Sequence, residues 1–462
     1  MGTEIRRRMV LAVMCAGMFL VLLDVSVVNV ALPSIQTGLG TDLAGMQWVV
    51  DAYGITLASL LLAAGGLGDV RGHRRMVLAG LVTFGTASVG CGLAPTVEVL
   101  VTMRAAQGVG AAVLLPSTMA VITHTFPGRA EQSRALGTWA GVSSLALPSG
   151  PLLGGALVSW LGWRAVFLVN VPVTLLAAVM VRRVVAESRG QERVLDLPAA
   201  FAAVAGLACL VFAVITGGQR GLDRAVLVAL VGVIAAAALF VRIERRASQP
   251  LVPLALLRSP TFVGANLVAG AMNFVGIGTV FAVTLYLQSV QGRSALTSGL
   301  DLLPLFVPLA ALSPLAGRLT ARLGPRPPML LGLVIGAAGA FGLVRLQPES
   351  AYAVLLPPLL GLGLGMGLLT SAVVTAAMQS VPGERAGLAS GMNNTARQAA
   401  GALGVACFGA VLGSAAAGAS FVAHLHSLGV IAGLVWLAAA AVTAATVPGR
   451  AGPGPRSYEP AG

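Results

Sequence analysis

The sequence contains no lysine, so all 29 of its basic residues are arginines. Charged residues of either sign make up only 10% of the 462 residues, against about a quarter in an average soluble domain. Aromatic residues are also scarce at 5%, whereas 57% of the chain is hydrophobic and its mean hydropathy is +0.90. A water-soluble core cannot bury so much apolar surface. The composition therefore excludes an ordinary soluble domain and predicts an all-α, polytopic membrane protein.

Other absences exclude further classes of protein. Cysteines are few and scattered within apolar runs, at Cys15, Cys91, Cys209 and Cys407. Their spacing fits neither a metal site nor a disulfide framework, so buried free thiols are expected. The net charge of +13 comes from arginines in short bursts between apolar runs, not from a continuous basic face, which argues against nucleic acid as a partner. No phosphate-binding loop, metal-ligand cluster or catalytic dyad is present, so we expect neither an enzyme nor a bound cofactor.

Apolar stretches long enough to cross ~30 Å of hydrocarbon occur about fourteen times. Their predicted starts lie near Met9, Gln47, Arg75, Val97, Arg134, Gly162, Leu197, Asp223, Thr261, Ser298, Pro327, Ala351, Ala386 and Phe421. The first run is too long for a cleavable signal peptide and merges into the rest of the protein. The tail from Pro448 is rich in proline and glycine and is predicted to be disordered.

Arginine is distributed unequally between the predicted loops. With the N-terminus inside, the outer loops hold only Arg164, Arg220, Arg224, Arg293 and Arg345, and the remaining loop arginines are cytoplasmic. This bias follows the positive-inside rule and predicts that both termini are cytoplasmic.

One loop pattern occurs twice. The segment 65–74 reads GGLGDVRGHR and the segment 317–326 reads GRLTARLGPR, so both fit G-x-L-x-x-x-x-G-x-R. The match predicts a parallel repeat with a substrate cavity between its halves. The predicted divisions are an N-terminal six-helix bundle at 1–190, two inserted helices at 191–258, a C-terminal six-helix bundle at 259–447 and a disordered cytoplasmic tail at 448–462.

Several motifs follow one another in the order and on the helices of a known family. They read LDVSVVNVALP from Leu23, RAAQGVGAA from Arg104, LPSGPLLGGAL from Leu147, WRAVFLVNVP from Trp163 and ASGMNNTARQ from Ala389. Together with the loop at 65–74, they resemble the fourteen-helix drug:proton antiporter family of the major facilitator superfamily. The chain departs from that family pattern at Val70 and His73, where basic residues are usual. It also departs at Ala146, directly before LPSGPLLGGAL, where the family's motif in the fifth helix usually begins with glycine.

The resemblance implies export of small amphipathic drugs or antibiotics in exchange for protons, by alternating access. The implied partners are the drug, protons and the lipids of a bacterial plasma membrane, with no cofactor beyond the proton gradient. A proton-coupled importer of a small metabolite is the alternative within the same class. A membrane-embedded enzyme or a receptor is the alternative from another class, and no motif in the sequence supports either.

Asp24 and Arg104 are the candidate proton-coupling residues. Each lies about nine residues from a proline at the outer end of its helix, or ~14 Å at 1.5 Å per residue, so they are expected to share a depth. Arginine does not release its proton at a usable pH, so Asp24 is the candidate carrier and Arg104 its switchable partner. A permanent structural ion pair is the alternative.

Four polar residues are candidates for the substrate cavity, namely Asp51, Asp301, Asn394 and Arg397. Asp51 also fits a solvated rim, and Arg397 also fits a brace for its own helix. Because Asp24, Asp51 and Asp301 all lie in the outer half, the cavity is expected to accept cationic or neutral amphipaths better than anions, unless Arg104 and Arg397 reverse the local field.

Two glycine-containing motifs are predicted to serve conformational change. The resemblance implies a gating loop of Gly65, Asp69, Gly72 and Arg74, in which Asp69 is a latch; a basic loop that only fixes topology is the alternative. The antiporter motif comprises Gly150, Pro151, Gly154 and Gly155. Proline removes a helical hydrogen bond, and glycine lets a neighbouring helix approach closely. The resemblance implies that this motif seals the path against leak, and ordinary tight packing is the alternative.

Overall fold

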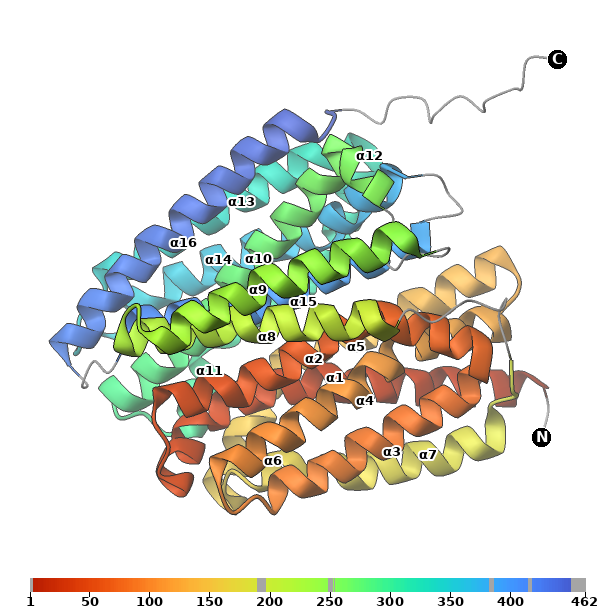
Figure 1. The fold of residues 1–462 in the computed structure, drawn as a ribbon, viewed down its shortest axis with the longest axis horizontal. Coiled ribbons are helices and arrows are strands. Elements are labelled where there is room, and N and C mark those ends of the chain that lie inside the picture. Colours follow the sequence, from red (N-terminus) through yellow and green to blue (C-terminus); the bar gives the residue numbers. More distant parts are fainter. Residues whose placement is uncertain are drawn as a thin grey trace.

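The computed structural model describes residues 3–188, 197–247, 252, 254–381, 386–413 and 418–449, and these residues form helices and short connections (Figure 1). The α-helices are α1 (Thr3–Leu39), α2 (Leu43–Arg71), α3 (His73–Gly92), α4 (Val97–Thr125), α5 (Arg129–Leu161), α6 (Ala165–Leu168), α7 (Asn170–Val184), α8 (Leu197–Arg220), α9 (Arg224–Arg246), α10 (Pro260–Leu285), α11 (Ala295–Asp301), α12 (Leu303–Leu323), α13 (Arg326–Gly342), α14 (Tyr352–Gln379), α15 (Ala386–Leu412) and α16 (Ala419–Thr446). A π-helical turn, Tyr286–Val290, extends α10. The all-α class predicted from composition is confirmed.

Length and apolar composition mark membrane-crossing helices. Among the described residues, 12 helices are long and apolar enough to cross a membrane, and Leu145–Leu161 within α5 is a shorter apolar helix. The chain is therefore a multi-pass membrane protein. The predicted tail at 448–462 falls, from residue 450 onward, outside the described residues.

The repeated loop pattern places glycine where the backbone requires it. Gly72 and Gly324 occupy the same position in the two copies and adopt φ of +99° and +81°. Side chains with a Cβ rarely adopt this region, so glycine ends α2 and α12 at the turn into the next helix. The sequence match therefore corresponds to a shared local structure.

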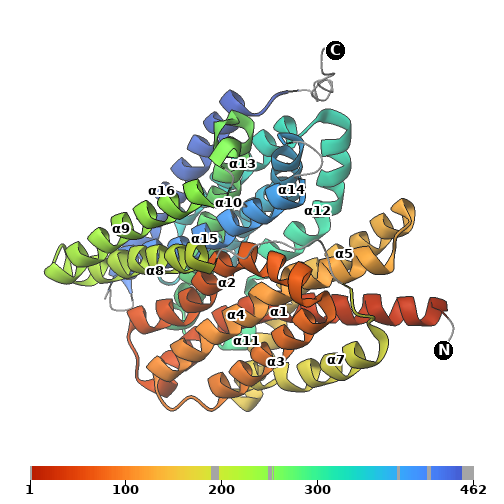
Figure 2. The same cartoon turned by 45° about the vertical axis from the view of Figure 1, so that its right-hand side comes forward.

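The helices pack in the same pairwise pattern in two sets. In the first set α1 contacts α4, α5 and α7, α4 contacts α2 and α3, and α3 contacts α7. In the second set α10 contacts α14, α15 and α16, α14 contacts α12 and α13, and α13 contacts α16. Figure 2 shows the two sets as separate bundles, which we call the N-half and the C-half. The predicted boundaries at 190 and 258 stay predictions, because residues 189–196, 248–251 and 253 lie outside the described part of the chain.

The two additional helices lie against one flank of both halves. α8 contacts α2 of the N-half and α15 of the C-half, and α9 contacts α8 (Figure 1). Ile55, Val211, Ile215, Ala402 and Ala406 form a small apolar cluster where α2, α8 and α15 meet. α8 therefore spans the junction between the halves.

Hydrogen bonds join the halves at one end. We call the side on which α1 begins and α16 ends the terminal side (Figure 1). At the opposite end, the Gln47 side-chain amide donates to the carbonyl oxygens of Val405 and Ala406, at 3.2 and 2.9 Å. Nearby, Gln288 donates to the carbonyl oxygen of Val30 at 2.9 Å. Within the described ranges, these are the side-chain hydrogen bonds between the halves, so the halves are held together away from the terminal side.

Candidate functional site

Asp24 on α1 and Arg104 on α4 form a buried ion pair. The Nη1 of Arg104 donates to Oδ2 of Asp24, and each residue is only 1% exposed. The equal depth expected from counting along the two helices therefore corresponds to direct contact. Removing both charges from water is expensive unless the remaining hydrogen-bonding groups are also satisfied.

Neutral side chains of the N-half supply hydrogen bonds to this ion pair. Asn170 on α7 and Gln107 on α4 donate to Oδ1 of Asp24, at 3.0 and 3.2 Å. Gln107 also donates to the Oγ of Ser88 on α3 at 2.8 Å, and accepts from Arg104 Nη1 at 2.9 Å. Helices α1, α3, α4 and α7 thus each contribute a polar side chain to one network. A rotation of any of them would change the environment of Asp24.

Apart from Asp24 and Gln107, the Arg104 side chain contacts a backbone carbonyl oxygen and two aromatic rings. Its Nε donates to the carbonyl oxygen of Val49 on α2 at 3.0 Å. Its guanidinium carbon lies 4.4 Å from the ring centroid of Tyr53 and 5.9 Å from that of Phe167. Cation–π contact with a desolvated ring stabilises such a charge by up to about 2 kcal/mol. Arg104 therefore keeps favourable contacts that are independent of Asp24.

Sequence reasoning missed Gln107, Asn170 and Tyr53 as parts of this site. Gln107 lies one helical turn after Arg104, and Asn170 interrupts the apolar run FLVNVPV. A polar residue within an apolar span usually faces the bundle interior. The positions of Gln107 and Asn170 in the sequence could therefore have indicated that both belong to the site.

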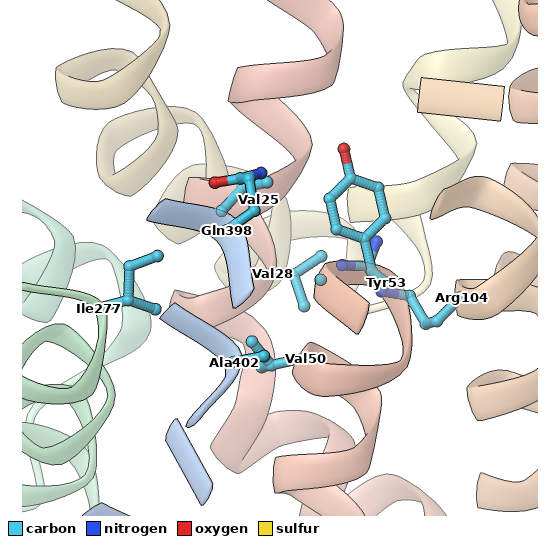
Figure 3. Close-up of a pocket in the computed structure, with 9 residues that line it drawn as sticks. Val25, Val28, Val50, Tyr53, Arg104, Ile277, Gln398 and Ala402 are labelled. Atoms are coloured by element: carbon cyan, nitrogen blue, oxygen red, sulfur yellow. The ribbon is translucent and has the colours of Figure 1, made fainter. Parts of the chain in front are cut away.

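A small cavity lies where this network meets the C-half (Figure 3). It is lined by Val25, Val28, Val50, Tyr53, Gly54, Arg104, Ile277, Gln398 and Ala402. The cavity has a volume of about 30 Å³, which is enough for water. This is far below the roughly 300–1,000 Å³ of a drug-binding pocket. Of the predicted site residues, Arg104 lines this cavity, whereas Asp51, Asp301, Asn394 and Arg397 do not.

Asp51 lies between the halves, and no hydrogen-bonding partner for it is found in the described part of the chain. It is fully buried on α2, and neither carboxyl oxygen has a partner among the described residues. Along α2, Asp51 lies between two residues that contact α15. Gln47 donates a hydrogen bond to α15, and a Cβ at Gly54 would lie 3.5 Å from the Cβ of Ala402. A solvated rim is therefore excluded for this conformation.

Asp301 lies apart from the Asp24 network. It ends α11, before α12 begins, and its Oδ2 lies 2.6 Å from Nη1 of Arg293. Burial raises the pKa of the Asp301 carboxyl, and the neighbouring Arg293 opposes that effect. Tyr352 donates to the carbonyl oxygen of Asp301 at 2.9 Å, which holds this bend against α14.

The predicted gating loop contacts the segment after α7. Glu187 accepts from the backbone N–H of Arg74 at 3.1 Å and lies 3.6 Å from the Nε of Arg75. Arg74 donates to the carbonyl oxygen of Arg182 at 2.9 Å. The structure describes neither the burial of Gly65 nor the side chain of Asp69. The latch role of Asp69 therefore stays a prediction.

Replacing Glu187 with alanine is expected to loosen this attachment. The variant loses a backbone hydrogen bond and a partly exposed ion pair, which together stabilise by about 1 kcal/mol. A thermal unfolding scan of the purified protein should show a lower midpoint. Glu131→Ala is the matched control, because Glu131 pairs with Arg7 at an exposed site. Equal midpoints for the two variants would mean that Glu187 does not hold the loop.

The antiporter motif lies between α1 and α11. A Cβ at Gly150 would collide with the side chain of Ser26, and one at Gly154 would lie 3.0 Å from the carbonyl oxygen of Val27. On the other face, a Cβ at Gly155 would lie 2.6 Å from the Cα of Leu296. A Cβ at Gly299 of α11 would collide with the carbonyl oxygen of Pro151.

The motif therefore serves two different contacts. Gly150 and Gly154 allow α5 to pack on α1 within the N-half. Gly155 and Pro151 pack on α11 of the C-half, at the end where Gln47 and Gln288 also join the halves.

Residues 14–405 match the family model described as Major Facilitator Superfamily. The chain is 37% identical over 401 residues to the multidrug resistance protein Stp of Mycobacterium tuberculosis, covering 86% of this chain and 74% of the relative. It is 34% identical over 402 residues to the methylenomycin A resistance protein of Streptomyces coelicolor, covering 87% and 85% of the two chains.

Solved structures share the fold at lower identity. A bacterial homologue of the human lysosomal transporter Spinster, in an inward-facing and unoccupied conformation, superposes with a TM-score of 0.68 at 18% identity. That superposition covers 96% of this chain and 97% of the other. A peptide transporter in complex with alafosfalin gives a TM-score of 0.69 at 17% identity, covering 98% and 99% of the chains.

Proposed function

The chain belongs to the Major Facilitator Superfamily, and we propose that it exports small amphipathic drugs or antibiotics in exchange for protons, by alternating access. The observation that carries the proposal is similarity over 86–88% of this chain to relatives named for drug resistance or export, at 33–38% identity. The family is one of transporters, so an enzymatic role has no support. The proposed partners are an amphipathic drug, protons and membrane lipids.

Proton coupling is assigned to Asp24 and Arg104. In the present conformation the carboxyl group of Asp24 contacts one guanidinium and two amide donors. A movement of α1 away from α4 would remove the guanidinium from a buried acid, and a carboxyl without a counter-charge binds a proton more readily. Asp51 is a second proposed protonation site, because it is buried between the halves without a partner among the described residues.

We propose fourteen transmembrane spans and cytoplasmic termini. To the 12 helices identified by length and composition we add α2, of 29 residues, and α5, which contains the apolar stretch Leu145–Leu161. Because the arginine bias follows the positive-inside rule, we propose that the terminal side faces the cytoplasm of a bacterial cell. The packing of α5 on α11 and the bonds of Gln47 and Gln288 are accordingly assigned to an outer gate that is closed in this conformation.

Expression in a bacterial strain stripped of its own efflux pumps tests the proposal. Export predicts that the protein raises the inhibitory concentration of at least one antibiotic or dye in a screen, and that an uncoupler abolishes the gain. Import of a metabolite, the alternative, predicts greater sensitivity or no change. Proteoliposomes given only a pH gradient should then accumulate the same compound if the coupling is to protons.

A further inference from the structure

A row of polar side chains lies between α10 and α15 of the C-half. Asn393 on α15 donates to Oδ1 of Asn266 on α10 at 3.4 Å. One turn further along α15, the Nε of Arg397 donates to Oδ1 of Asn273 at 3.3 Å. Asn393 is 1% exposed, and its own Oδ1 has no partner among the described residues. A cation and three amides therefore lie along the contact between these two helices.

Arg397 has no acidic partner in the part of the chain that the structure describes. Across the described ranges, no carboxylate lies within 4.0 Å of its guanidinium, whereas Asp24 and Asp301 are already paired with Arg104 and Arg293. Asp51 faces the part of α15 between Ala402 and Ala406, which is at least five residues, or ~7.5 Å along the helix, beyond Arg397. An intramembrane cation without a counter-charge is expensive and usually functional.

The position of Arg397 adjoins the cavity between the halves. Its chain neighbour Gln398 and, one turn away, Ala402 line the cavity, as does Ile277, one turn beyond Asn273 on α10 (Figure 3). Arg397 is partly exposed, unlike the fully buried Arg104. Of its five N–H donors, Nε alone has a hydrogen-bond partner in the described part of the protein, so the two terminal nitrogens remain available.

We infer that Arg397 binds an anionic group, a carboxylate or a sulfonate, on the exported amphipath. The inference rests on the proposed function and names its substrate class. Two terminal N–H groups in a fixed plane match the two oxygens of such a group, and the bond strengthens in an apolar surrounding. Asn273 holds the guanidinium in place through Nε, and Gln398 offers an amide at the cavity wall.

This assignment replaces the expectation of cationic or neutral substrates. That expectation rested on three aspartates, and the structure pairs two of them with arginines and buries the third. Of Asp24, Asp51, Arg104, Asp301 and Arg397, Arg397 is the charge that is both partly exposed and without an ion-pair partner among the described residues. The alternative role is a structural brace, in which Arg397 only joins α15 to Asn273.

Two fluorescent probes separate these roles, because they differ only by a sulfonate. They are 8-anilino-1-naphthalenesulfonate and N-phenyl-1-naphthylamine, and their binding to the purified full chain is measured by equilibrium dialysis. Arg397→Gln should weaken binding of the sulfonate about tenfold or more and leave the neutral probe within twofold, since a hydrogen bond to a charged group is removed. Arg397→Lys should retain a preference for the sulfonate. Arg318→Gln, at an exposed arginine of α12, is the control and should change neither affinity.

Each other outcome overturns the inference. Equal weakening for both probes indicates a structural brace, and a sulfonate that does not bind to the wild-type protein excludes the anion site. Either result leaves the proposed export function standing if the resistance screen is positive. A negative resistance screen combined with selective loss of sulfonate binding would instead preserve the anion site and reject the proposed export.

Discussion

Asp24→Asn is expected to reduce export driven by a pH gradient to the level of empty proteoliposomes, while the protein still reaches the membrane. Asparagine keeps the size of the side chain and can still accept hydrogen bonds from Asn170 and Gln107, but it cannot bind and release a proton. Arg104 retains the carbonyl oxygen of Val49 and the ring of Tyr53, so the fold should survive. Substrate exchange without a pH gradient should persist, since it needs no net proton movement.

Loss of export alone does not separate a proton carrier from a structural ion pair. Removing one partner of a buried pair leaves an uncompensated charge, which costs roughly 3–5 kcal/mol in soluble proteins. The double variant Asp24→Asn/Arg104→Gln removes that charge and should recover thermal stability. If proton-driven export returns with stability, the pair is structural and the carrier role is wrong. If stability returns and export does not, the carrier role stands.

Gly155→Leu is expected to uncouple export without preventing insertion. A side chain at this position would overlap the backbone of Leu296 on α11, so α5 and α11 could not close as they do here. Overpacking of this kind costs about 1–3 kcal/mol, which shifts the balance between conformations by roughly 5- to 150-fold away from the closed outer contact. Normal abundance in the membrane, combined with lost export or a proton leak measured with a pH-sensitive dye in proteoliposomes, is the expected result.

Two further variants of α5 make this test specific. Gly137→Leu is the matched control, because no atom of the described residues lies within 4 Å of a Cβ at Gly137, and it should export normally. Gly150→Leu would collide with Ser26 inside the N-half, so its main effect should be lower stability of that half. Normal export by Gly155→Leu would show that the α5–α11 contact does not gate transport.

Counting along the helices predicted much of this arrangement. The membrane-crossing segments, the shared local structure at Gly72 and Gly324, and the common depth of Asp24 and Arg104 all depend on distance along the chain. Each residue of a helix advances by 1.5 Å, and the thickness of the hydrocarbon core is fixed, so position along the membrane normal can be read from sequence. The roles assigned to these residues remain predictions.

Rotation about each helix axis was decided only by tertiary packing. In a soluble helix an apolar stripe shows which face is buried, but in a membrane the lipid-facing side is apolar too, and the glycine- and alanine-rich helices here are apolar around their circumference. The sequence therefore could not show that Gln107 and Asn170 turn toward Asp24, or that Gln47 crosses to α15. Nor could it show that Asp301 pairs with Arg293 at a bend, while Arg397 meets only an amide among the described residues. Sequence determined the depth of each charge, and the packing of helices with similar faces determined its partner.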